Sequence, residues 1–432
     1  DIQAAMLPEW EDLREHASEI KEHTLTHLAD YLDEFSRNLE SNGVIVHWAK
    51  DAQEFNEIAY SILAEHNVKK LVKSKSMLTE ECEMNKYLIA KGIDVVETDL
   101  GERILQLMNL KPAHIVVPAA HITRDEVGEL FEKDGISKDI GNHDPTYLTQ
   151  CARYSLRQEF IEADAGMTGC NFGVASTGDC VVCTNEGNAD MSTSIPKLHI
   201  VSMGIDKVIP NYDTLAVFQR LLARSATGQP SVSFTSQFRK ARPGSEMHVI
   251  LVDNGRSNII ADQLHWRTAK CIRCGACMNT CPVYRRSMGY SYNYFIPGPI
   301  GINLGMVHNP KKHSGNVSAC SLCLSCDLVC PVKVAPGSQI YYWRQALEGF
   351  GTENKEKKYM SVAMTELYQH PAIYSVATKY AHFANIIPQK MMDVKPNPWS
   401  VGHDMPHFPK KTFHTLYKQM MEEEKEKEKG IK

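Results

Sequence analysis

Residues 271–282 read CIRCGACMNTCP, and residues 320–331 read CSLCLSCDLVCP. Both stretches follow the pattern C-x2-C-x2-C-x3-C-P, so the chain holds an internal repeat of one cysteine motif. A short loop with two-residue gaps can place three thiolates at the corners of one [4Fe–4S] cube and direct backbone N–H groups at the sulfurs. The proline after each fourth cysteine stops the local hydrogen bonding and turns the chain away. The repeat therefore predicts two [4Fe–4S] clusters.

The ligand sets are expected to cross between the motifs. The fourth cysteine of such a run cannot reach the cluster that its own loop surrounds, and in two-cluster ferredoxins it binds the other cluster. We expect cluster I to take Cys271, Cys274, Cys277 and Cys330, and cluster II to take Cys320, Cys323, Cys326 and Cys281. Crossed ligands would hold two one-electron centres close together. Shielding from water is expected from Ile272, Met278, Leu322, Leu324 and Val329.

Zinc is the competing interpretation of these cysteines. Structural zinc prefers two separated pairs of ligands, which two triplets followed by C-P do not resemble. The total of 13 cysteines is odd, which argues against a secreted disulfide framework. Cys180 and Cys183 form a further C-x2-C pair, but they lie in a predicted strand, where residues three apart face opposite sides. We expect that pair not to bind metal.

Length and composition restrict the class of protein. A chain of 432 residues, 43% of them hydrophobic, is expected to form two or three globular domains. A formal net charge of −5 does not suggest a nucleic-acid partner. We find no secretory signal and no apolar run of the roughly 18–20 residues that cross a bilayer. The chain starts at Asp1, so we expect that residues precede it. These features predict a cytoplasmic protein that meets a membrane only through partners.

Upstream of the cysteines, short apolar runs alternate with helical patterns, which predicts a mostly parallel, layered α/β domain over residues 43–265. Apolar residues at three- and four-residue steps predict one long amphipathic helix within residues 1–42, either a partner-docking arm or a helix packed on its own domain. Residues 266–345 are expected to form the helical two-cluster domain. Residues 346–432 are expected to be a helical tail, with a Pro-rich stretch over 388–409 and a solvated charged helix at 422–429. The expected strands are 44–48, 70–72, 93–97, 115–117, 181–184, 199–203, 232–234 and 248–252.

A glycine- and hydroxyl-rich region over residues 166–188 has two interpretations. Its backbone N–H groups could cradle a phosphate or carboxylate, or its glycines could serve tight turns and close packing. If a small-molecule pocket exists, the candidate residues are Thr168, Asn171, Thr177, Glu186, Asn188 and His199. We identify no catalytic constellation, so the catalytic residues stay unknown. The Tyr- and Arg-rich segment 284–299 is either a cover for a cluster or an ordinary loop.

Further stretches complete a recognisable pattern: residues 20–25, 73–77, 97–102, 185–188, 199–210 and 297–301, and the tail around Trp399. Together with the twin motif behind a large α/β domain, they resemble the lactate utilization protein B family, the iron–sulfur subunit of a three-protein L-lactate oxidation system. The resemblance implies an N-terminal domain of the LUD type, with a fold like sugar-phosphate isomerases and CoA-transferases. It also implies a helical ferredoxin domain and a short C-terminal domain.

The resemblance also implies a function. The expected role is electron transport during oxidation of L-lactate to pyruvate, with a cysteine-rich subunit and a second LUD-domain subunit as partners and a further, unidentified electron acceptor. Two alternatives stay open. The α/β domain could itself be an enzyme that binds a small organic acid or a CoA ester, or it could be a docking platform for partner subunits.

Overall fold

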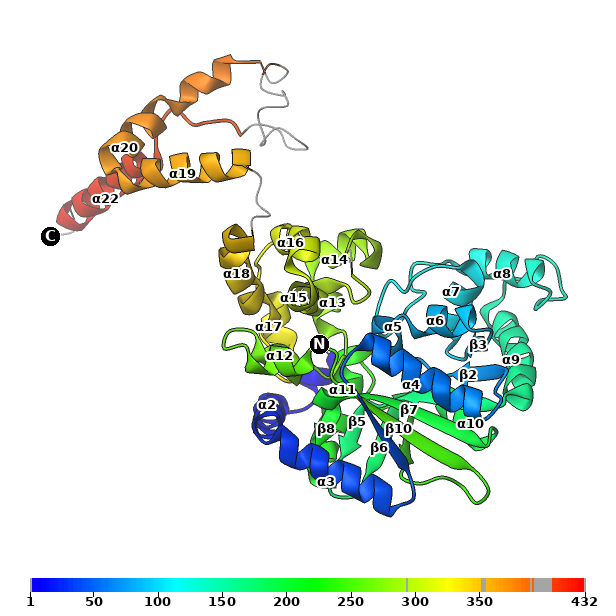
Figure 1. Ribbon diagram of the computed structural model, residues 1–432. Helices are drawn as coiled ribbons and strands as arrows, with labels where there is room; N and C mark the ends of the chain where they lie inside the picture. The colour runs from blue at the N-terminus through cyan, green and yellow to red at the C-terminus, as the bar shows by residue number, and fades with distance from the viewer. Residues whose placement is uncertain (1, 293, 351–354, 389–390, 392–405, 431–432) are drawn as a thin grey trace. The chain divides into compact units, whose positions relative to one another are not determined.

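A parallel sheet lies at the centre of the N-terminal region of the computed structural model (Figure 1). The structure describes residues 2–292, 294–350, 355–388, 391 and 406–430. They divide into two units, residues 1–351 and 352–432. In the first unit, six strands pair in parallel in the order β1-β10-β7-β4-β2-β3. The strands are β1 (Ile45–Ala49), β2 (Lys70–Lys73), β3 (Asp94–Glu97), β4 (Ala165–Gly169), β7 (Leu198–Gly204) and β10 (Glu246–Val252).

Both faces of this sheet are buried, as is usual for parallel sheets. On one face, Ile200 and Ile250 pack against Phe55 and Leu63 of α4 (Ala52–Glu65). On the other, Val201 and Val249 share a core with Phe35 of α3 (Leu28–Ser41). The predicted layered α/β domain is confirmed. The remaining helices of this region are α5 (Met77–Glu81), α6 (Met84–Ala90), α7 (Leu100–Met108), α8 (Arg124–Lys133), α9 (Pro145–Glu162), α10 (Asn188–Ser194), α11 (Tyr212–Ala226) and α12 (Arg256–Ala261).

A smaller sheet follows the carboxyl end of β4. Its order is β8-β5-β6-β9, with β8 (Val208–Ile209), β5 (Phe172–Val174), β6 (Asp179–Thr184) and β9 (Phe234–Phe238). The strand predicted at 232–234 begins only at Phe234, because Phe234 pairs with Thr184, the last residue of β6. The length of β6 therefore sets where its neighbour starts.

The prediction of one long helix within residues 1–42 is wrong. Besides the short α1 (Ile2–Ala5), the structure has two helices, α2 (Trp10–Thr26) and α3 (Leu28–Ser41). They meet at His27, which leaves the helical conformation at φ −111° and ψ 31°. The break lets α2 pack on α11 while α3 covers the main sheet. Periodicity alone cannot show it, because the apolar residues keep helical spacing on both sides of His27.

The prediction of a strand over residues 115–117 is also wrong. The backbone N–H groups of Val116 and Val117 both donate to Nδ1 of His114, at 3.0 and 3.1 Å, rather than to a neighbouring strand. The carbonyl of Val116 accepts a hydrogen bond from Nζ of Lys75 at 2.7 Å. Side chains therefore satisfy the backbone that a ladder would otherwise pair.

Residues 166–169, interpreted from the sequence as part of a loop, instead form most of the fully buried central strand β4. A Cβ at Gly166 would lie 1.6 Å from the carbonyl oxygen of Ser192, so glycine is required where α10 approaches the sheet. A Cβ at Gly173 would lie 2.7 Å from Sδ of Met203. At these two positions the packing interpretation of the glycines is confirmed.

The cysteine region is helical, and it shares a core with the α/β region. Its helices are α13 (Ala276–Thr280), α14 (Pro282–Ser287), α15 (Gly298–His308), α16 (Pro310–Ala319), α17 (Ser325–Val329) and α18 (Pro336–Ala346). One continuous apolar core joins Ile20 of α2 and Phe218 of α11 to Met278 and Val332 beside the cysteines. The N-terminal helix α2 therefore packs within its own chain, as one of its two interpretations stated.

The second unit contains α19 (Lys355–Gln369), α20 (Pro371–Tyr380) and α22 (Phe413–Gly430). The charged segment 422–429 continues α22, and its described side chains are exposed, as predicted for a solvated helix. Most of the Pro-rich stretch, and Trp399 with it, lies outside the described residues. None of the helices within 2–292, 294–350, 355–388 and 406–430 is long and apolar enough to cross a bilayer.

Candidate functional site: the cysteine loops and the adjoining pocket

The two cysteine motifs fold into equivalent loops. Arg273 and Leu322, at matching positions, have φ of 60° and 53°, and Gly275 and Leu324 have φ of 81° and 58°. Left-handed backbone is unfavourable for arginine and leucine, so its recurrence marks a loop shaped for a ligand. The N–H groups of Arg273 and Leu322 each lie 3.4 Å from the sulfur of the cysteine two residues before them. Such N–H groups stabilise thiolates that bind iron.

The fourth cysteine of each motif lies near the thiols of the other loop. Burial raises the pKa of Cys274, and the nearby Cys330 and Cys271 thiols raise it further. Burial likewise raises the pKa of Cys320, with Cys281 and Cys323 acting in the same direction. The helices that follow the loops, α13 and α17, pack against each other. Binding to iron removes the proton of a thiol, so the eight cysteine sulfurs that the two loops bring together suit clusters as a donor set.

The two loops differ in exposure. Ile272 and Met278 are buried beside the first loop, and the sulfur ligand Cys274 is 8% exposed. In the second loop Cys323 is exposed, and Leu324 and Leu328 are 44% and 75% exposed. Leu324 is thus only partly covered, although its Cδ2 lies near Gly337 and the Cys326 sulfur, and its shielding of a cluster stays a prediction. Leu322 and Val329 are only half-buried. The second loop therefore reaches the surface at Cys323 and Leu328, although its Cys326 is buried.

Three cationic side chains donate hydrogen bonds to backbone carbonyl oxygens of cysteines in the two motifs. Nζ of Lys207 donates to the carbonyl of Cys271 at 2.8 Å, and Nε of Arg14 donates to the carbonyl of Cys330 at 3.0 Å. Nη2 of Arg344 donates to the carbonyl of Cys320 at 2.6 Å. These bonds fix the loops, and they place positive charge next to thiolates that carry net negative charge when they bind a cluster.

The predicted cover segment lies against Cys281, the fourth cysteine of the first motif, through Tyr292. This side chain is 7% exposed, and burial, together with the neighbouring Cys281 thiol, holds the pKa of its hydroxyl above the usual value. Tyr290, in contrast, is 50% exposed and donates to the carbonyl of Lys111 at 2.9 Å. Only part of the segment therefore covers a cysteine, and the rest packs on the α/β region.

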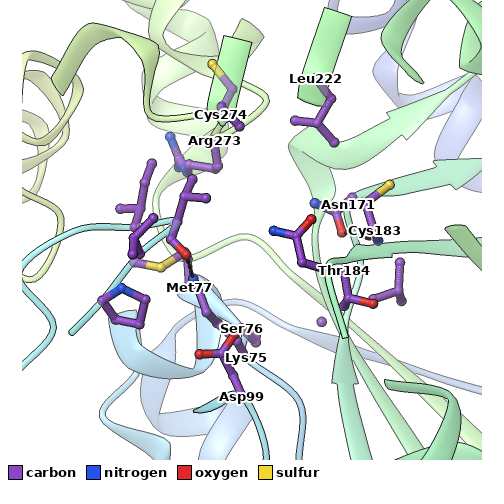
Figure 2. Close-up of a pocket in the computed structure, with 18 of the residues that line it drawn as sticks. Lys75, Ser76, Met77, Asp99, Asn171, Cys183, Thr184, Leu222, Arg273 and Cys274 are labelled. Carbon is purple, nitrogen blue, oxygen red and sulfur yellow. Dashed lines mark hydrogen bonds between the residues drawn. The ribbon is translucent and has the colours of Figure 1, made fainter. Parts of the chain in front are cut away.

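A cavity of about 510 Å³ lies between the first cysteine loop and the carboxyl end of the main sheet. Figure 2 shows Asn171, Cys183 and Thr184 on one side of it and residues 75–77 on the other, with Arg273 and Cys274 above. Parallel α/β sheets commonly bind ligands at the carboxyl ends of their strands. Cys274 of the first loop thus lines a cavity at the edge of the sheet where ligands commonly bind.

Three of the six pocket candidates line this cavity: Asn171, Glu186 and Asn188. Burial raises the pKa of Glu186 to about 7, and the neighbouring Asp99 adds to the rise. The other three candidates are engaged elsewhere. Oγ1 of Thr168 lies 3.0 Å from Nε2 of His199 inside the sheet, and burial lowers the pKa of that histidine to about 3. Thr177 donates to Asp179 in a turn.

Sequence reasoning missed the cavity walls contributed by Lys75, Asp99 and Arg273. The first two belong to stretches that carried the family resemblance, 73–77 and 97–102, which lie directly after β2 and β3. The third such stretch, 185–188, also lines the cavity. These three stretches meet at one edge of the sheet, and their shared place in the family pattern is the signal in the sequence that points to the cavity. The pair Cys180 and Cys183 packs into two different cores, as expected for opposite faces of β6.

Comparisons with known proteins match each part of this architecture. Residues 32–252 match the LUD domain, residues 267–334 the 4Fe-4S dicluster domain, and residues 345–422 the C-terminal domain of lactate utilisation protein B. Lactate utilization protein B from Oceanobacillus iheyensis is 38% identical over 439 residues, which span 98% of this chain and 91% of the relative. The chain belongs to the lactate utilization protein B family.

A further relative and a solved structure were also found to be similar to this chain. A relative from Escherichia coli, described as the uncharacterized electron transport protein YkgF, is 36% identical to this chain. The matched region covers 97% of this chain and 90% of the relative. A crystal structure of a DUF162 family protein from Deinococcus radiodurans covers 52% of this chain and 98% of its own at 13% identity, with a TM-score of 0.30. As a member of the lactate utilization protein B family with a dicluster domain, the chain is an electron-transfer protein that holds two [4Fe–4S] clusters.

Proposed function

We propose that this protein relays electrons from the oxidation of L-lactate to pyruvate through its two clusters to a further acceptor. The observation that carries the proposal is the unequal exposure of the cysteine loops. The first loop contributes Cys274 to the wall of the large cavity, and the second presents Cys323 at the surface of the unit. Electrons would enter at the cavity side and leave at the exposed side. The match to the family's C-terminal domain supports the lactate assignment.

The proposal includes the crossed ligand sets. Cys271, Cys274, Cys277 and Cys330 would hold cluster I, and Cys320, Cys323, Cys326 and Cys281 would hold cluster II. The proximity of Cys330 to the first loop and of Cys281 to the second supports this assignment. Each cluster accepts and releases single electrons. Oxidation of one lactate releases two electrons and two protons, so two one-electron centres match the stoichiometry.

Arg14, Lys207 and Arg344 would have two tasks in this relay. Their bonds to the cysteine carbonyls hold the loops rigid, which keeps the thiolates in place when the charge changes. Their positive charges also favour the more negative, reduced state of each centre. The cysteine-rich subunit and the second LUD-domain subunit implied by the resemblance are proposed as the partners that deliver and accept the electrons.

A second candidate function rests on the cavity itself. Nη1 of Arg273, within the first loop, is buried and has no hydrogen-bond partner among the residues that the structure describes. A carboxylate in the cavity would satisfy it. The cavity of about 510 Å³ has the size of sites for ligands much larger than lactate, so a CoA ester or a larger organic acid fits this candidate better than lactate does.

The isolated, cluster-loaded protein is expected not to oxidise L-lactate. The clusters accept single electrons and not a hydride, so we assign the oxidation of the substrate carbon to a partner. Under anaerobic conditions, L-lactate should leave the cluster absorbance of the protein alone unchanged and should bleach it after the partner subunits are added. The measurement needs the full chain, because the core shared by the two regions would be cut in a fragment of residues 1–265.

The outcomes separate the two candidates. Bleaching by L-lactate without any partner would contradict the relay and favour an enzymatic α/β domain. Absence of bleaching with all partners present would also contradict the relay. D-lactate is the matched control substrate, because it has the same charge and composition with the opposite configuration.

A further inference from the structure

Three potential metal ligands gather at the amino end of β10, far along the chain from the cysteines. Glu246 and His248 lie in the first half of that strand, and His66 directly follows α4. One ligand atom from each lies within 4.8 Å of the others. The Oε1 atom of Glu246 is 3.3 Å from Nε2 of His66 and 2.6 Å from Nε2 of His248. Two imidazoles and a carboxylate are a common ligand set for zinc.

The protonation of His66 is fixed by its backbone partner. Nδ1 of His66 lies 2.9 Å from the carbonyl oxygen of Ile62. A carbonyl oxygen can only accept, so Nδ1 carries the hydrogen and Nε2 of the neutral ring has a free lone pair. That lone pair faces the carboxylate of Glu246. In the neutral ring, this lone pair and the carboxylate are two acceptors that a metal ion between them would satisfy.

His248 is held in a matching way. Its Nδ1 lies 2.9 Å from Nε2 of His47, and the two rings stack with centroids 5.2 Å apart. This contact orients the ring so that Nε2 points to Glu246. Histidines that bind metals almost always use the other ring nitrogen in such a hydrogen bond, which fixes their tautomer. In both histidines, Nδ1 therefore already has the hydrogen-bond contact that orients a metal-binding ring.

We propose that His66, Glu246 and His248 bind one divalent transition-metal ion of the zinc type. Zinc–ligand bonds of about 2.0–2.2 Å in a tetrahedron place neighbouring ligand atoms about 3.3–3.5 Å apart. The separation of His66 from Glu246 already has this value. The Glu246 side chain is 45% exposed and can rotate to open its shorter distance to His248. The fourth position faces solvent and takes a water molecule or a group from a partner.

This site is separate from the iron centres. The cavity beside the first cysteine loop lies after the carboxyl ends of the strands, whereas Glu246 and His248 lie near the amino end of β10. A metal ion here would fasten the end of α4 to the sheet next to the edge strand β1. Its expected role is structural. No local motif could reveal it, since about 180 residues separate His66 from Glu246.

The test uses the tag-free, cluster-loaded full chain with Zn²⁺ as the probe. Equilibrium dialysis at micromolar free Zn²⁺ followed by elemental analysis should find about one zinc per chain in addition to the cluster iron. His66→Ala and His248→Ala should each weaken binding by about 100-fold or more. His47→Ala, which changes only the supporting contact, should weaken it by about 10- to 100-fold. Unchanged cluster absorbance would show that each variant is folded.

His16→Ala is the matched control. His16 is an exposed histidine paired with one carboxylate, that of Glu19, at 3.7 Å, and its replacement should leave zinc binding unchanged. Co²⁺ should give the strong visible absorption of a tetrahedral site in the wild type and not in His66→Ala. Equal zinc retention by wild type and His66→Ala would overturn the proposal. So would absence of zinc from the wild type, which would mean that the two histidines are simply protonated partners of Glu246.

Discussion

Replacing Cys281 with serine is expected to remove the signal of the cluster held by the second loop, although Cys281 belongs to the first motif. The tight loop through Cys277 already supplies three corners of its own cube, and the next residues form α13 and lead away from it. Cys281 then lies near Cys320. The variant should lose about half of its iron and keep the other cluster. Iron analysis and electron paramagnetic resonance of the reduced protein would measure both effects.

Two further variants make this result decisive. Cys323→Ser removes a ligand of the second loop, and Cys274→Ser removes a ligand of the first. If the ligands cross, Cys281→Ser has the spectrum of Cys323→Ser. A spectrum of Cys281→Ser that matches Cys274→Ser instead would mean that each motif closes its own cluster, and the ligand assignment at Cys281 and Cys330 would be wrong.

Lys73→Met is expected to destabilise the α/β region by about 3–5 kcal/mol, because it leaves a buried carboxylate without its cation. The Lys73 side chain is 1% exposed, and its Nζ lies 2.7 Å from Glu97 and 3.2 Å from Glu80. Burial opposes the charge on Lys73, but the two carboxylates outweigh burial and hold its pKa above the usual value. Methionine keeps much of the side-chain volume, so the loss is mainly electrostatic. Denaturant unfolding of the cluster-loaded protein at pH 7 would measure it.

Lys70→Met provides the control within the same strand. Lys70 pairs with Glu159 and Glu162 at a partly exposed position, where its side chain is 21% exposed and water screens the charges, so the expected loss is about 1 kcal/mol. Burial raises the pKa of Glu97 in the native protein. In Lys73→Met this carboxylate should take up a proton as the pH falls, so the penalty should shrink in acid and grow toward alkaline pH. A Lys73→Met variant as stable as Lys70→Met at pH 7 would contradict this account.

Local chemistry made the cysteine loops predictable from sequence. The spacing of ligands determines the loop, and the structure repeats the left-handed backbone of Arg273 at Leu322. Strands such as β2 and β10 are also predictable from local sequence, because each is a short run of apolar residues. The central strand β4 could not be predicted from sequence, because Gly166 and Gly169 are typical of turns. Glycine is required at these positions by tertiary packing, which a local pattern does not show.

The cavity could be predicted only in part. Asn171, Glu186 and Asn188 follow polar loop patterns, so sequence reasoning found them. Thr168 and His199 are also polar, but their side chains face the interior of the sheet, where they form a hydrogen bond with each other. Which face a residue takes depends on the order of the strands, and that order places β4 between β7 and β2 in a way that no local pattern encodes.

The most direct test of the central claim is a reductive titration of the anaerobically purified protein, followed by electron paramagnetic resonance and by analysis for iron and zinc. Two [4Fe–4S] clusters predict about eight iron atoms per chain and, at full reduction, about two unpaired spins. The packing of α13 against α17 brings the loops together, so the two signals should broaden each other. One spin per chain, or zinc in place of iron at the cysteines, would contradict the account.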